Sequence, residues 1–175
     1  MDRTTRTIVL EEEQQRLEQE LDEVAEEAAG EDPESDAYER LHQRGQRLER
    51  EIVGVLSLQE AYPDGEVTLG ALRTDEFALV EDHTKDVQDA KVGGRNVDGA
   101  GRKFFVAAGL LDAPFLDEDA GFEARARAVG QQPMQVTEWL EHRINELSTP
   151  DVDFRNGFGE RVAAKRQEQA TSPPN

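Results

Sequence analysis

The first sixty residues carry a helical spacing of apolar side chains that is interrupted only once. Apolar residues recur three or four positions apart on both sides of the segment GEDPESD, residues 30–36. Gly30 suits the end of one helix, while Asp32 and Pro33 suit the start of the next. Two helices joined by so short a loop pack antiparallel. The spacing therefore predicts a charged, coiled-coil-like helical hairpin over residues 1–60.

Each predicted helix of the hairpin carries one apolar stripe, at residues 7–29 and 34–58, and the two stripes form the expected seam. The seam residues are Leu10, Leu17, Leu21, Val24, Leu41, Leu48, Ile52 and Val55. Gly45 weakens the second helix but permits a close approach of the two backbones. Because heptad spacing pairs helices within a chain or between chains, the pattern leaves both arrangements open.

Residues 61–150 predict a small helical domain with at most one short strand, so the expected fold class is mainly α. The strand follows a turn at Pro63–Gly65 and covers Glu66–Leu69. The expected helices cover residues 75–90, 104–111, 121–129 and 133–147. Phe77, Val80 and Val87 are expected to point inward from the first of these helices.

Two low-complexity stretches are expected to lack regular structure. The glycine-rich segment 91–101, KVGGRNVDGAG, lacks the spacing of a dinucleotide or phosphate loop and is expected to be a mobile connection. Residues 151–175 fall to low hydrophobicity, with Phe154 and Phe158 as their only anchors. They are expected to form a flexible tail.

The most apolar stretch of the chain is FFVAAGLLDAPFL, residues 104–116. One interpretation is that it forms the core beneath Phe77, Val80 and the last helix. The other is that it lines a groove for an apolar or amphipathic partner helix. In that second interpretation the partner-binding residues are Phe104, Phe105, Leu110, Leu111, Phe115, Leu116 and Trp139.

The charge of the chain limits its partners and its setting. There are 39 acidic and 20 basic residues, giving a net charge of −19, which repels nucleic acid and anionic membranes. Lysine is scarce, cysteine is absent, and this composition resembles that of proteins from salt-loving organisms, where molar salt screens such repulsion. An ordinary acidic protein is the alternative. With no stretch near 18 apolar residues, we expect a soluble, cytoplasmic protein without nucleic-acid or membrane partners.

No motif for catalysis or for a bound metal is recognisable. His42, His83 and His142 lie in no HExxH or similarly dense ligand pattern. The acidic loop around residues 112–119 departs from the EF-hand pattern, and no serine lies in a nucleophile elbow. The sequence therefore predicts no catalytic residue, no metal and no cofactor, and favours binding or assembly over an enzyme.

Three segments in order, EVTLGALRTDEF, RKFFVAAGLLDAPFL and VTEWLEHRINELSTP, resemble the small helical tail assembly chaperones of long-tailed bacterial and haloarchaeal viruses. The resemblance covers residues 66–150 and does not include the hairpin. It implies a protein that binds the long helical tape-measure protein during tail building and leaves before the particle matures. Such families are commonly made in two lengths by ribosomal frameshifting, with which the tail at 151–175 is consistent.

Three other classes remain open. A structural virion subunit, of the tail or the head-tail junction, would dock its hairpin on neighbours and stay in the particle. An acidic DNA mimic would occupy the cationic site of a nucleic-acid-binding protein, and DNA would compete with it. An enzyme without a recognisable motif is the third.

Overall fold

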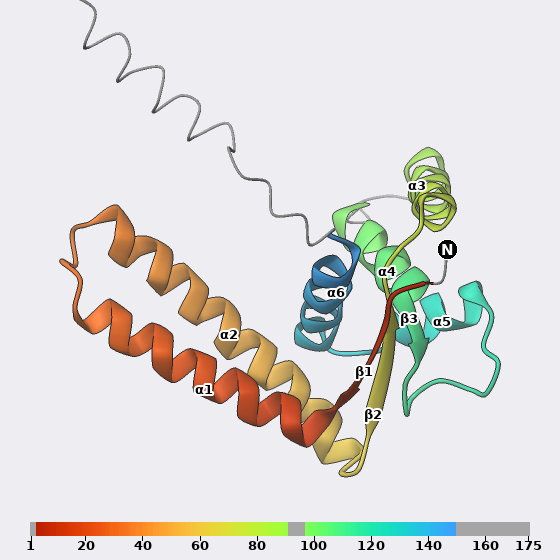
Figure 1. Ribbon diagram of the computed structural model, residues 1–175. Helices are drawn as coiled ribbons and strands as arrows, with labels where there is room; N and C mark the ends of the chain where they lie inside the picture. Colours follow the sequence, from red (N-terminus) through yellow and green to blue (C-terminus); the bar gives the residue numbers. More distant parts are fainter. Residues whose placement is uncertain (1–2, 91–96, 150–175) are drawn as a thin grey trace, which may run out of the picture.

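The computed structural model describes residues 3–90 and 97–149, which form a long helical hairpin on a small body of helices and strands (Figure 1). In chain order the elements are β1 (Thr5–Val9), α1 (Leu10–Ala29), α2 (Asp36–Ala61), β2 (Glu66–Gly70), α3 (Thr74–Asp89), α4 (Val97–Gly109), β3 (Leu110–Asp112), α5 (Phe122–Val129) and α6 (Met134–Ser148). The mainly α fold class is confirmed.

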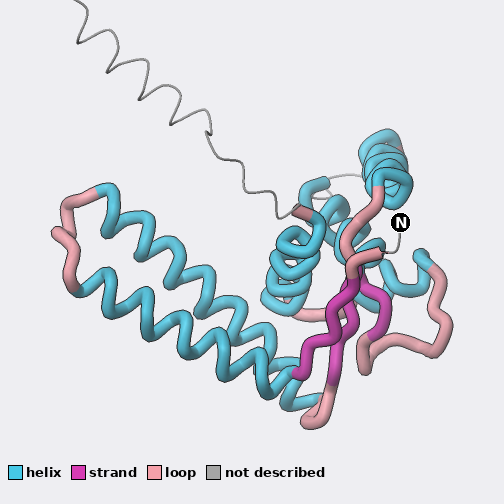
Figure 2. Tube along the Cα trace, in the orientation of Figure 1, coloured by secondary structure: helices cyan, strands magenta, loops and turns pink. Residues whose placement is uncertain are grey.

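The hairpin is formed by α1 and α2, which run antiparallel and project away from the strands (Figure 2). Ser35, rather than Asp32, caps α2: its side chain accepts a hydrogen bond of 3.1 Å from the Tyr38 N–H. Of the predicted seam residues, Leu10, Leu17, Val24, Leu48 and Val55 are buried, and Leu21, Leu41 and Ile52 are partly buried against them. The seam is therefore filled within one chain.

The sheet has three antiparallel strands in the order β1-β2-β3, where the sequence indicated at most one. The run Thr5–Val9, which is β-branched except at Arg6, pairs with β2 in the register Thr5↔Gly70 to Val9↔Glu66. Its last residues, 7–9, were expected to begin the first helix. On the other side of β2, Leu110 pairs with Leu69, so the chain leaves α4 directly as a strand. The strand predicted at residues 66–69 is confirmed.

One hydrophobic core joins the hairpin to the body. Buried residues from the hairpin base, β2, β3 and α6 belong to a single cluster: Leu10, Leu17, Val55, Leu58, Val67, Leu69, Leu110, Trp139, Leu140 and Ile144. Helix α2 lies so close to α6 that a Cβ on Gly54 would be 2.5 Å from the Gln135 carbonyl oxygen. The hairpin is thus fixed to the body along the inner half of α2.

Two expected features of the body differ from the structure. Phe77, predicted to point inward, is 48% exposed, because α3 packs mainly on α4 and only Val80 of that helix is buried. The second part of the glycine-rich stretch is helical, since α4 begins at Val97. Residues 91–96 and the tail predicted at 151–175 lie outside the described residues.

Gly45 and Gly54 both lie in α2, but we expect a glycine to alanine substitution to change the free energy of unfolding in opposite directions at the two positions. A Cβ at Gly45 would meet only Leu21 and Val24 side-chain atoms at 3.9 Å, which is ordinary contact. We expect Gly45→Ala to raise the free energy of unfolding by about 0.5–1 kcal/mol through helix propensity. Gly54→Ala should destabilise by at least about 1 kcal/mol, because backbone atoms block the added carbon. Urea unfolding of both variants measures the difference, and equal effects would contradict it.

Candidate functional site

The outward face of α6 borders a series of hollows in the surface. Side chains three or four residues apart share one face of a helix. The residues of α6 and its C-cap that line hollows follow this spacing: Met134, Thr137, Glu138, Glu141, His142, Asn145, Ser148 and Thr149. The opposite face is buried and consists of Val136, Trp139, Leu140, Arg143 and Ile144, and Thr137 at the border between the two faces is buried as well. Helix α6 therefore separates the core from a continuous strip of surface.

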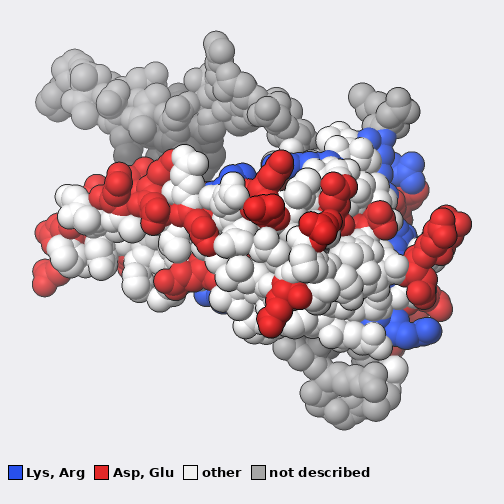
Figure 3. All heavy atoms as spheres, turned by 90° about the horizontal axis from the view of Figure 1, so that it is seen from below, with Lys and Arg blue, Asp and Glu red and all other residues white. Residues whose placement is uncertain are grey.

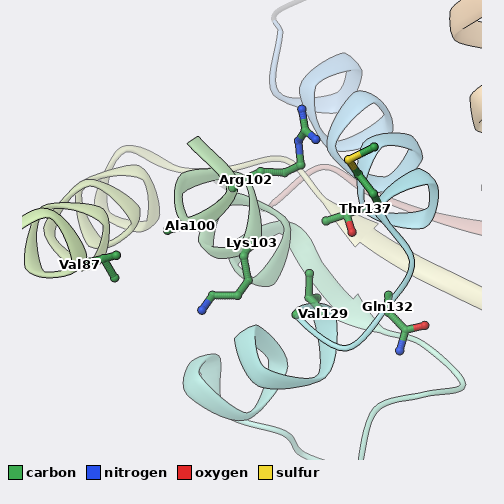
Figure 4. A pocket seen from close by; sticks show the side chains of 10 residues that line it. Val87, Ala100, Arg102, Lys103, Val129, Gln132 and Thr137 are labelled. Atoms are coloured by element: carbon green, nitrogen blue, oxygen red, sulfur yellow. The ribbon is translucent and has the colours of Figure 1, made fainter. Parts of the chain in front are cut away.

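Three hollows follow this strip, and together we call them the α6 groove. The first, of about 560 Å³, lies between the end of α3, the start of α4 and the start of α6 (Figure 4). The second, of about 250 Å³, lies between α2, α4 and α6. The third, of about 360 Å³, lies where α3 begins and α6 ends. Arg102 lines the first and second hollows, and Asn145 lines the second and third, so the three adjoin.

The two ends of the α6 groove expose large apolar side chains. Met134 in the first hollow is 59% exposed, and Phe77 in the third is 48% exposed. Val87, which is partly exposed, adds apolar surface to the first hollow, into which Lys103 extends from α4 (Figure 4). Val53, Leu56 and Leu79 are also exposed, so it is the position of Met134 and Phe77 beside hollows that makes the α6 groove a candidate binding surface.

The middle of the α6 groove is charged but balanced. Arg102 contacts Glu141 at 2.7 Å and Glu138 at 3.3 Å, and Arg50 contacts Glu138 at 3.4 Å. The second hollow is lined by Arg47, Arg50 and Arg102 and by Glu51, Glu138 and Glu141. Since each cation has a carboxylate beside it, this hollow does not resemble a site for a free anion.

Beneath the groove, a buried ion cluster connects α1, α2 and α6. Arg143 is 3% exposed, and its Nε lies 2.6 Å from Glu13 while its Nη2 lies 3.1 Å from Glu51. Trp139 Nε1 donates to the same Glu13 oxygen as Arg143, at 3.0 Å. The cluster was not predicted from the sequence. The spacing of Glu13 and Glu51 could have indicated it, because each stands three or four residues from buried seam residues and therefore on the buried face of its helix.

The Glu51 carboxylate also faces the second hollow. Its Oε1 lies 3.0 Å from His142 Nδ1 and 3.3 Å from Arg47 Nε, although neither contact is aligned as a hydrogen bond. Glu51 is 1% exposed, whereas the His142 and Arg47 side chains are 28% and 42% exposed. These two side chains therefore separate the buried cluster from solvent and form the floor of the groove.

The charge state of Glu13 makes stability depend on pH. Burial raises the pKa of Glu13, but hydrogen bonds from Arg16 and Trp139 and the charge of Arg143 outweigh burial and hold that pKa below its ordinary value. A carboxylate whose pKa is lower in the folded than in the unfolded chain stabilises the fold above its ordinary pKa, about 4.3. That contribution is lost as the pH falls through the folded value.

We therefore expect the free energy of unfolding to fall as the pH drops below about 4.3, and to fall less steeply in Glu13→Gln. Urea unfolding at a series of pH values and constant salt measures both slopes. Glu12→Gln, at an exposed position on the same helix, is the matched control and should follow the unsubstituted protein. Parallel slopes for all three proteins would show that Glu13 has no such role.

The apolar stretch 104–116 divides between core and surface. Leu110 and Trp139 are fully buried and Phe104 is 8% exposed, whereas Phe105, Leu111, Phe115 and Leu116 are partly buried. Of the predicted partner-binding residues, only Phe105 lines the α6 groove. Leu111 and Leu116 line a separate hollow beside the acidic loop 117–119. The groove residues Phe77 and Met134 were not in the predicted set.

The three histidines lie apart from one another. His83 packs its ring 5.2 Å from Phe104 and 5.0 Å from Phe122, His42 stacks on Tyr38, and His142 lies beside Glu51. Within residues 3–90 and 97–149, no three histidine, aspartate or glutamate side chains are grouped so that they would hold a metal ion.

None of the helices in those ranges has the length and apolarity needed to span a membrane.

The fold and the groove define a mainly α protein with an amphipathic surface strip and a projecting acidic hairpin. Comparison with known protein families, with curated proteins and with solved structures found no match to this chain. The groove and the buried cluster are therefore the features that bear on its function.

Proposed function

We propose that the protein binds a helical segment of a partner protein in the α6 groove. The observation that carries this proposal is the order of surfaces along α6: exposed apolar side chains at both ends and paired charges between them. From Met134 to Thr149 the helix spans about 22 Å, at 1.5 Å per residue. A partner helix of about four turns, apolar at both ends of one face, matches this order.

More specifically, we propose that the partner is a long tape-measure protein and that this chain is a viral tail assembly chaperone in a halophilic setting. The resemblance over residues 66–150 supports the class, and the groove lies largely within that range. The hairpin supplies charge: residues 18–39 contain eleven acidic residues and neither lysine nor arginine. On the face seen in Figure 3, acidic side chains follow the hairpin and occur at several places on the body. Such a surface keeps a complex with an aggregation-prone helix in solution.

The alternative of a structural virion subunit required the hairpin to dock on neighbouring chains as a coiled coil. The seam is already filled within one chain, since Leu17, Val24 and Leu48 are at most 3% exposed. This observation favours the chaperone over the subunit. The acidic hairpin tip also fits a DNA mimic, so the test of the proposal has to distinguish a DNA mimic from a chaperone.

The proposal is tested by placing a photo-crosslinking amino acid at position 77 in the full chain and irradiating native lysate in molar salt. We expect an adduct with a very long, helix-rich protein that is absent from mature particles. A crosslinker at position 34, in the exposed hairpin loop, is the matched control and should give no such adduct. Adducts with tail-tube or portal proteins would indicate a structural subunit. An adduct from position 34 that DNA suppresses would indicate a DNA mimic.

The halophilic part of the proposal predicts a dependence on salt. We expect the helical circular dichroism signal to decrease when potassium chloride is lowered from molar to dilute concentration, because screening of the net charge of −19 is lost. An unchanged signal across the series would contradict the halophilic setting but not the proposal that the α6 groove binds a partner helix.

A further inference from the structure

Strand β1 forms one edge of the sheet, and half of its backbone groups face away from β2 (Figure 2). In an antiparallel ladder, every second residue exchanges hydrogen bonds with the neighbouring strand. The Ala71 N–H donates to the Thr4 carbonyl at 2.8 Å, so the even-numbered residues of β1 are the ones bonded to β2. The N–H and carbonyl groups of Thr5 and Thr7, and the N–H of Val9, therefore point outward.

The edge of β1 is open within residues 3–90 and 97–149. Thr5 and Thr7 are exposed there, and their backbones make no hydrogen bond outside the ladder with β2. Edge strands are commonly protected by proline, lysine, a bulge or a covering side chain, and β1 has none of the first three. The opposite edge is protected, because β3 has three residues and its Leu110 carbonyl accepts a hydrogen bond of 2.7 Å from Arg125.

The outward groups of β1 are complementary to those of a second β1. If two such strands pair antiparallel, the bonded positions are odd-numbered, so Thr7 lies opposite Thr7 of the second copy and Thr5 lies opposite Val9. Each Thr7 N–H then donates to the Thr7 carbonyl of the other copy, and each Val9 N–H donates to a Thr5 carbonyl. This register uses every outward donor and is symmetric about a two-fold axis.

The charges along the edge also favour a second copy as its occupant. Arg6 is exposed near the start of β1, and Glu11 and Glu12 are exposed just beyond its end, in the first turn of α1. Antiparallel pairing brings the basic end of each strand beside the acidic end of the other, whereas parallel pairing would bring like charges together. Such complementarity fixes both the direction and the register of the pairing.

We infer that two copies of this chain pair through the open edge of β1 and join their three-stranded sheets into one continuous sheet. Five residues of strand span about 17 Å, and a contact of that length falls short of the roughly 1,200–2,000 Å² of a stable interface. The dimer is therefore weak and forms at high protein concentration, in salt that screens the net charge of −19 on each copy. The inference does not depend on the proposed function, because no residue of β1 lines the α6 groove.

The pairing is tested by disulfide formation between single-cysteine variants of the full chain, which has no cysteine of its own. In the expected register the two Thr7 Cα atoms lie about 5.5 Å apart, within disulfide range, whereas the two Thr68 Cα atoms lie about 14 Å apart, three strand spacings. Thr7 and Thr68 face each other across the ladder with their hydroxyls 3.0 Å apart, so Thr68→Cys is the matched control. In molar salt we expect Thr7→Cys to form a covalent dimer at least about tenfold faster than Thr68→Cys.

Sedimentation over a range of protein concentrations measures association without a disulfide. We expect Thr7→Lys, which sets two ammonium groups opposite each other at the two-fold axis, to stay monomeric at concentrations at which the unsubstituted chain and Thr68→Lys dimerise. Circular dichroism shows that both lysine variants are folded.

Equal disulfide rates at positions 7 and 68 would overturn the inference. So would a chain that is monomeric at every concentration, or a dimer that Thr7→Lys leaves intact. A photo-crosslinker at position 7 that captures a different protein from native lysate, in a chain that forms no dimer, would also overturn it, because a strand of that protein would then occupy the edge.

Discussion

Arg143→Met is expected to lower the free energy of unfolding by about 3–5 kcal/mol, far more than the loss of a surface charge would. The substitution leaves Glu13 and Glu51, at 3% and 1% exposure, without the cation that both of them contact. Glu13 keeps its hydrogen bonds from Arg16 and Trp139, but Glu51 keeps only the unaligned contacts to Arg47 and His142. A buried carboxylate that has lost its hydration and has no aligned partner costs far more than the ion pair itself contributes. Urea unfolding at constant salt measures the change.

Two controls identify the cause of that loss. Arg50→Met removes an arginine whose side chain is 50% exposed and whose contact to Glu138 is 3.4 Å, and we expect at most about 1 kcal/mol. The triple variant Glu13→Gln, Glu51→Gln, Arg143→Met removes all three charges together and should recover part of the stability lost by Arg143→Met alone. Equal losses for Arg50→Met and Arg143→Met would contradict the buried cluster.

Trp139→Ala is expected to cost about 3–5 kcal/mol, because it empties a fully buried site among α1, α2 and α6. Trp139→Phe retains most of the apolar volume but removes the Nε1 donor to Glu13, and we expect it to cost about 1–3 kcal/mol. The midpoint of urea unfolding orders the two variants. A midpoint unchanged by Trp139→Ala would place the indole on the surface and return it to the partner-binding residues.

The elements that the sequence predicted well are those determined by local periodicity. The hairpin helices, α3, α5 and α6 each repeat apolar side chains at helical spacing over two turns or more. Strands β1 and β3 lack such a signal, because their stability comes from pairing with β2, which for Thr5 means Gly70, a partner 65 residues away. A short strand with a distant partner is not specified by its own residues.

The candidate site was predicted only in part, for two physical reasons. The groove is assembled from α2, α3, α4, α5 and α6, so no single segment contains its pattern. Phe77 was assigned to the core because it follows helical spacing with Val80. Helix α3 packs mainly on α4, however, and therefore buries a narrower face than the spacing implies. The buried Glu13, Glu51 and Arg143 resembled surface charges in a sequence crowded with them.

The ladder of β1 and β2 continues directly into the helix pair α1 and α2, with the Leu10 N–H bonded to the Gly65 carbonyl at 3.1 Å where the two meet. The same two stretches of chain thus run side by side from the sheet to the hairpin loop, and the sheet-end half of α2 packs on α6 while the loop end projects away from the body (Figure 1). The hairpin is therefore anchored at one end and free at the other. We expect a load applied at the loop to separate the helices turn by turn, each step breaking contacts of a few seam residues and, at Arg44 and Glu20, one ion pair of 2.8 Å. The ion cluster at Glu13 and Glu51 is the point at which such opening must stop before the body itself comes apart.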